Sequence, residues 1–183
     1  MNELTAVLTA LIFGTASNLD TLILALTWGL RGGRLTPGQG AVIGGVTTAV
    51  TWCALTVGAL AGSLTRGAAL LGPVLLVGMG LWTLLDWLRR LGEQEQAPPP
   101  PEGLRSCLPL AGALAVNNAG MGVAAGASGL SPLWASAVNL AVTLLALVLG
   151  SALGRRAEGR GWSRYALPLS GLLLVVLGLM EMG

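Results

Sequence analysis

The chain of 183 residues is strongly apolar, with 54% hydrophobic residues, only 10% charged residues and a formal net charge of +2. This composition excludes a water-soluble globular domain and indicates a polytopic membrane protein. The small net charge also argues against nucleic-acid binding. The sequence contains no histidine, which excludes histidine-based acid–base catalysis and the common zinc sites. Because no nucleophile–base pair is visible either, we expect no enzymatic activity.

Six apolar stretches follow one another along the chain, at about residues 4–30, 39–64, 68–88, 104–127, 132–153 and 165–182. Each has roughly the 17–25 residues that an α-helix needs to cross about 30 Å of hydrocarbon. Glycines and prolines fill the breaks between them, as expected where helices end and begin. The sequence therefore predicts an all-α fold with six transmembrane helices.

The arginines indicate how these helices are oriented. The loops are numbered in chain order, so that the first loop joins the first and second apolar stretches. One arginine, Arg66, falls in an even-numbered loop. By the positive-inside rule, the odd-numbered loops are expected in the cytoplasm and both termini outside. The other nine of the ten basic residues lie in odd-numbered loops: Arg31, Arg34, Arg89, Arg90, Arg105, Arg155, Arg156, Arg160 and Arg164.

A proline-rich segment at 92–103 divides the chain into a first repeat at 1–91 and a second at 104–183. Its composition predicts an extended, solvated cytoplasmic linker. Three helices per half is an odd number, so the second half must enter the membrane from the opposite side. The predicted architecture is two inverted three-helix repeats, an arrangement common in secondary transporters, with the solute site near the midplane.

Asp20 is the main candidate site residue, because it lies near the middle of the first apolar stretch. A carboxylate at the bilayer centre costs about 2.5–3.5 kcal/mol on insertion scales, which makes it a functional-site hypothesis by default. Carboxylate, carbonyl and hydroxyl oxygens are the ligands of hard divalent cations. The predicted ion-binding set is Asp20, Asn18, Ser17, Thr21, Asn117, Asn118 and Met121, with Asp20, Asn18, Asn117 and Asn118 as metal ligands.

Several polar residues have a plainer alternative. Asparagine and threonine in membrane helices often only join helices by hydrogen bonds, and we favour that interpretation for Thr47, Thr48 and Thr143. Asp86 is a possible vestibule residue, or else a surface ion-pair partner of Arg89 or Arg90.

Other residues give expectations about packing. Trp52 and Trp82 are expected in the core, and Trp28 at the membrane interface. Cys53 is expected to be protected within its helix, and Cys107 to be the more reactive thiol. Pairs of glycines four residues apart predict close helix contacts: Gly40/Gly44, Gly58/Gly62, Gly122/Gly126 and Gly150/Gly154.

These features resemble the small six-helix manganese efflux pump family of bacteria, which belongs to the lysine-exporter-type superfamily. That family carries a Ser-x-Asp-Ala-type motif in the middle of helices one and four. Asn18-Leu19-Asp20 resembles the first copy with asparagine in place of serine, and Asn117-Asn118-Ala119 resembles the second with alanine in place of aspartate. Thr47 stands where some members carry a glutamate. Further similar segments are 75–80, 150–158, 170–174 and, for the sporulation-membrane branch of the family, 28–31.

The resemblance implies a secondary exporter of a divalent cation, with manganese as the expected ion and no cofactor. It also implies a multi-pass protein of the bacterial plasma (inner) membrane. The expected partners are the lipid bilayer and a metal cation, and a homodimer or a further membrane subunit is left open. Two alternatives remain: a non-transporting membrane subunit or assembly factor with the same fold, and an exporter of another small solute.

Overall fold

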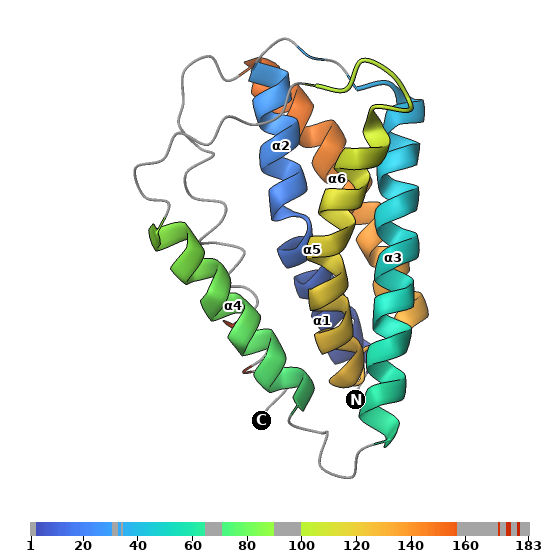
Figure 1. The fold of residues 1–183 in the computed structure, drawn as a ribbon, viewed down its shortest axis with the longest axis vertical. Helices are drawn as coiled ribbons and strands as arrows, with labels where there is room; N and C mark the ends of the chain where they lie inside the picture. The colour runs from blue at the N-terminus through green and yellow to red at the C-terminus, as the bar shows by residue number, and fades with distance from the viewer. Residues whose placement is uncertain are drawn as a thin grey trace.

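The computed structural model describes residues 3–30, 33, 35–64, 71–89, 100–156 and four single positions between 172 and 179. Most of the linker at 92–103 and of the predicted span at 165–182 lies outside this part. The described residues form six helices and the all-α class is confirmed (Figure 1). The helices are α1 (Glu3–Ser17), α2 (Leu19–Leu30), α3 (Pro37–Leu64), α4 (Leu71–Arg89), α5 (Cys107–Ala127) and α6 (Pro132–Arg156).

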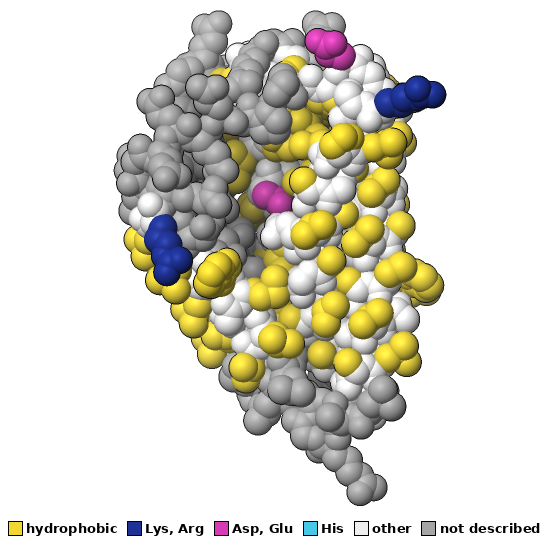
Figure 2. Space-filling view, viewed as in Figure 1, with side chains coloured by type: hydrophobic (Ala, Val, Ile, Leu, Met, Phe, Trp, Pro, Cys, Tyr) yellow, Lys and Arg dark blue, Asp and Glu magenta, His cyan; other side chains and the backbone are white. Residues whose placement is uncertain are grey.

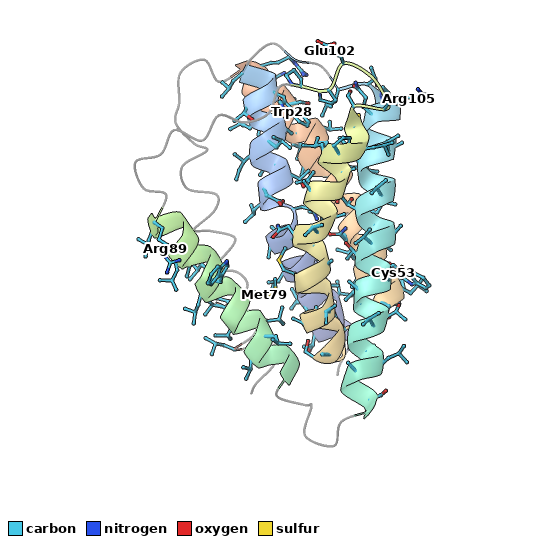
Figure 3. All side chains as sticks on the ribbon, viewed as in Figure 1. Trp28, Cys53, Met79, Arg89, Glu102 and Arg105 are labelled. Carbon is cyan, nitrogen blue, oxygen red and sulfur yellow. The ribbon has the colours of Figure 1, made fainter. Side chains whose placement is uncertain are left out.

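Three helices of the described part, α3, α5 and α6, are long and apolar enough to cross a membrane. The pair α1 and α2 forms a fourth such span if it is counted as one helix bent by 45°. We therefore treat the chain as a membrane protein, as the composition predicts. The helices α2 and α6 end at the same end of the bundle at which α3 and α5 begin, and Glu102 and Arg105 lie at that end (Figures 1 and 3).

The bend in the first span, at Asn18, is a feature that the apolar pattern did not predict. No proline causes it. Instead, the Nδ2 of Asn18 and the hydroxyl of Ser17 both donate to the carbonyl of Gly14, at 2.8 and 3.2 Å. Polar side chains that compete for helix carbonyls in this way disturb the regular hydrogen-bond ladder. The consequence is a new helix beginning, at Leu19, in the middle of the span.

Local sequence explains where the neighbouring helices begin and end. Thr36 and Gln39 form a reciprocal capping box at the start of α3, with N···O distances of 2.8 and 3.3 Å. The Nε2 of Gln39 also donates to the carbonyl of Pro101, which ties α3 to the segment before α5. Gly129 has a φ of 96°, the left-handed conformation that commonly ends a helix, and Pro132 then begins α6.

Glycines bring the helices together in two parallel pairs. The first pair is the α1–α2 span with α6, and the second pair is α3 with α5. A Cβ atom added to Gly126 would lie 2.1 Å from the carbonyl oxygen of Leu55, and one on Gly154 would lie 2.1 Å from that of Leu26. The glycine spacing correctly predicted close contacts in α5, in α6 and at Gly58 and Gly62 of α3. An added Cβ on Gly40, in contrast, would have no described atom within 4 Å.

Buried residues divide the bundle into three layers along its length. One apolar cluster contains Phe13 and Met121, and another contains Trp28 and Leu147. Between them in sequence, every helix of the two pairs contributes buried polar side chains, which we call the polar layer. Its members are Ser17, Asn18, Thr21, Thr47, Thr51, Asn118, Asn139 and Thr143.

The expectations that Trp52 and Trp82 lie in the core and that Cys107 is the more accessible thiol are wrong in this structure. Trp52 and Trp82 are 47% and 65% exposed, whereas Trp28 is buried. Cys107 is buried and Cys53 is exposed. The physical reason is that the outside of a membrane bundle faces apolar lipid. A hydrophobic side chain is therefore not driven inward as it is in water.

Candidate functional site

Asp20 lies in the first turn of α2, directly after the bend at Asn18, and is half-buried. Its Oδ1 accepts hydrogen bonds from the backbone N–H of Thr21 at 2.6 Å and from the Thr21 hydroxyl at 3.3 Å. A helix N-terminus offers unpaired N–H groups and a partial positive charge, which stabilise a carboxylate. The break in the span therefore creates a local environment in which an anion can be held at mid-depth.

The second oxygen of Asp20 reaches across to the other helix pair. Its Oδ2 accepts a hydrogen bond of 2.8 Å from the Nδ2 of Asn117 on α5. Asn117 is exposed and lies one turn before Gly120, where α5 meets Met79 of α4. The carboxylate and amide therefore open toward the side of α5 on which α4 packs. Figure 2 shows an acidic side chain in a hollow midway along this face.

The charge of Asp20 is not neutralised by a basic residue in the described part of the chain. Its hydrogen-bond partners there are the backbone, a hydroxyl and an amide, all of them neutral. The described residues also contain no group of three or more histidine, cysteine, aspartate or glutamate side chains that could hold a metal. The groups available to bind a cation here are one carboxylate and the neutral, oxygen-bearing side chains beside it.

Asn18 and Ser17 face away from Asp20, toward α6. Asn18 donates to the Oδ1 of Asn139 at 2.8 Å and accepts a hydrogen bond of 2.6 Å from the hydroxyl of Thr143. Ser17 donates to the same Asn139 oxygen at 3.0 Å. These bonds join the two helices of the first pair, and both polar atoms of the Asn18 side chain are occupied.

Asn118 on α5 is equally buried but has no such partners. Among the described residues, neither its Nδ2 nor its Oδ1 has a hydrogen-bond partner, and the same holds for the Nδ2 of Asn139 and the hydroxyl of Thr48. Asn118 lies one turn before Gly122, which packs against Ala54 and the backbone of Thr51. It therefore belongs to the face of α5 that packs on α3.

Of the predicted site residues, the structure brings together Asp20, Thr21 and Asn117. It turns Ser17 and Asn18 to α6, buries Asn118 in the polar layer, and packs Met121 into the Phe13 cluster. The side chain of Asp86 lies outside the described part.

Asn139 and Thr143, which hold Asn18, were not in the predicted set. Their spacing of four residues near the middle of an apolar stretch was the available signal, because it places both on one face of a helix.

Comparison of the chain with protein-family models, with curated proteins and with solved structures finds no match.

Proposed function

We propose that this protein is a secondary transporter that exports a cation across the membrane, with Asp20 as the ion-binding carboxylate. The observation that carries the proposal is the half-buried Asp20 at a helix break, with neutral partners only among the described residues. An ionised carboxylate in a membrane span is costly and needs a compensating charge. A transported cation supplies that charge during part of a cycle.

Asn117 has the chemistry to exchange with such a cation. In this structure its amide nitrogen donates to Asp20 and occupies the position in which a cation would neutralise the carboxylate. An amide carries a donor and an acceptor, and rotation of the group by 180° presents its oxygen instead. We propose that Asn117 contacts Asp20 by its nitrogen when the site is empty and turns its oxygen to the bound ion.

The helix contacts support an arrangement in two inverted halves. In such a repeat the first span corresponds to α5, and α3 corresponds to α6. The contact of the first span with α6 then corresponds to the contact of α3 with α5, and these are the most extensive helix contacts in the described part. The Asp20–Asn117 bond lies where the two halves meet, which is where inverted-repeat transporters bind their solutes.

Manganese is the proposed ion, on the resemblance to the bacterial manganese efflux family. The site offers oxygen ligands, which suit manganese, magnesium and calcium alike. The second half has Ala119 where the family carries an aspartate, and Ala119→Asp would add a second carboxylate to α5. We expect this variant to favour divalent over monovalent cations, measured as competition in vesicle uptake, because charge density at the site rises.

The decisive experiment is ion uptake by vesicles containing the purified protein, with Asp20→Asn as the test variant. Asparagine has nearly the same shape without the charge, so we expect manganese uptake to fall to the level of empty vesicles while insertion is unchanged. Glu102→Gln is the matched control, because Glu102 is an exposed carboxylate outside the helices. Full transport by Asp20→Asn would remove Asp20 from the site. An inactive wild-type protein with every cation tried would favour the non-transporting subunit.

A further inference from the structure

We infer that the moving bodies of the transport cycle are the two helix pairs rather than the two halves of the sequence. The first pair is the α1–α2 span with α6, and the second pair is α3 with α5. Each pair takes one span from each sequence half. This inference rests on the proposed function, because it concerns how access to Asp20 alternates.

Contacts within each pair are between backbones. In the second pair, a Cβ atom on Gly58 would lie 2.1 Å from the carbonyl oxygen of Val123. In the first pair, one on Gly29 would lie 2.4 Å from the carbonyl oxygen of Ser151. Backbones in direct contact cannot slide or tilt without collision, and packed interiors transmit displacement rather than absorb it. Each pair should therefore move as one body.

Polar contacts strengthen the first pair further. Asn18 of the first span binds both Asn139 and Thr143 of α6, at 2.8 and 2.6 Å. All the atoms in these bonds are buried. Separating the two helices would leave them without partners in the membrane, which is unfavourable.

Contacts between the pairs are of a different kind. Where α3 meets α6, Gly44 faces the side-chain tips of Leu140 and Leu144, at 3.1 and 3.2 Å from an added Cβ. Leucine side chains can change rotamer, so this contact can be remade after a small rotation. The Asp20–Asn117 hydrogen bond also runs between the pairs. An ion that displaces this bond therefore acts on the interface between the two bodies.

Motion of one sequence half against the other would have to break the tight contacts within the pairs. It would have to separate α2 from α6 and α3 from α5, the two glycine contacts in which backbones touch. Motion of the pairs leaves both backbone contacts intact. It changes side-chain contacts between the pairs, which are the leucine contact, the two apolar clusters and the Asp20–Asn117 bond.

Disulfide cross-links separate the two mechanisms. In a background carrying Cys53→Ala and Cys107→Ala, Gly14→Cys with Val138→Cys links the first pair, and Gly62→Cys with Ala127→Cys links the second. Gly44→Cys with Leu140→Cys links one pair to the other. An added glycine Cβ lies 3.2 Å from the Cγ1 of Val138, 3.3 Å from the Cα of Ala127 and 3.1 Å from the Cδ1 of Leu140, so the two positions of each link are in direct contact. Manganese uptake is measured for each protein in vesicles, oxidised and after reduction.

We expect the two links within pairs to leave uptake unchanged. The link between pairs should abolish uptake, and reduction should restore it. Loss of uptake on oxidation of either within-pair link would overturn the inference while leaving the proposed function in place, because the reduced protein would still transport. Absence of uptake in every reduced protein and in the wild type would overturn both together.

A second measurement avoids the packed glycines, whose cysteine variants can fail to fold. Spin labels are attached at Val57 of α3 with Val116 of α5, and at Val57 with Val148 of α6, all of which are exposed. Distances are compared between wild-type Asp20 and the Asp20→Asn variant, which mimics a neutralised site. We expect only the Val57–Val148 distance to change. A change in the Val57–Val116 distance, or in neither, would contradict motion of the pairs.

Discussion

The two helix pairs pack in the same way, but the buried asparagines at their centres differ in their hydrogen bonds. Both pairs are parallel and both bring backbones into contact at glycines. In the first pair, the Asn18 side chain donates to the carbonyl of Gly14 at the bend and forms hydrogen bonds with Asn139 and Thr143 of α6. In the second pair, Asn118 lies in an unbroken helix, in the same polar layer, and neither amide atom has a hydrogen-bond partner in the part of the chain that the structure describes.

This difference teaches that residue type and depth do not decide whether a polar group is structural. Asn18 fixes a helix break, and the break places Asp20 at a helix N-terminus. In the second half, α5 has no break and contains no carboxylate. The charged part of the site therefore belongs to one half, and the second half contributes the neutral Asn117.

Substitution of the tightly packed glycines that both pairs share should have the largest effect on stability. We expect Gly126→Ala and Gly154→Ala each to destabilise the fold by about 3 kcal/mol, because the added methyl collides with backbone that cannot move aside. Thermal unfolding in detergent measures the loss. Gly40→Ala is the matched control, since no atom of the described residues lies within 4 Å of its added Cβ, and it should be neutral or slightly stabilising. Equal behaviour of all three variants would show that the glycine contacts are not tight.

The next largest effect on stability should come from Asn18, whose side-chain amide is fully hydrogen-bonded. We expect Asn18→Leu to destabilise the fold by about 2 kcal/mol, because it removes two hydrogen bonds to α6 and one to Gly14 within the first span. The bend should also relax, because the side chain no longer competes for the Gly14 carbonyl. Chemical or thermal unfolding gives the free energy, and spin labels on α1 and α2 give the angle. An unchanged stability would mean that the bonds to α6 have no net value.

The sequence predicted the membrane class, the helical fold and most of the close glycine contacts, because hydrophobicity and small-residue spacing determine these directly. It also indicated Asp20 and Asn117, whose contact the structure shows. It could not predict which of Asn18 and Asn118 would be satisfied, because that depends on which helix face meets which neighbour. The outward position of Trp52 was missed for a related reason: hydropathy does not distinguish a core from a lipid-facing surface.

Substitution of Asn118 should change the stability of the fold in the opposite direction. We expect Asn118→Leu to stabilise the fold by about 1 kcal/mol, because it removes a buried polar group that makes no hydrogen bond to the described residues. Unfolding measurements on Asn118→Leu and Asn18→Leu should therefore differ in sign. A destabilised Asn118→Leu protein would show that Asn118 has partners of its own in the membrane. The contrast between the two pairs would then fail.

The smallest effect concerns two threonines at the same depth. Thr143 donates to Asn18 across the first pair and to the carbonyl of Asn139 in its own helix. Thr47, in contrast, donates to the carbonyls of Ile43 and Gly44 in its own helix. We expect Thr143→Val to cost about 0.6 kcal/mol, the average of an interhelical bond in a membrane protein, and Thr47→Val to cost less. The pairing can be isolated by a double-mutant cycle. In the Asn18→Leu background, Thr143→Val should cost less than it does in the wild type, since the bond to Asn18 is already absent and only the bond to the Asn139 carbonyl remains to be lost. An undiminished loss in that background would mean that Thr143 stabilises the pair by packing, and that the polar bonds do not hold α6 to the first span.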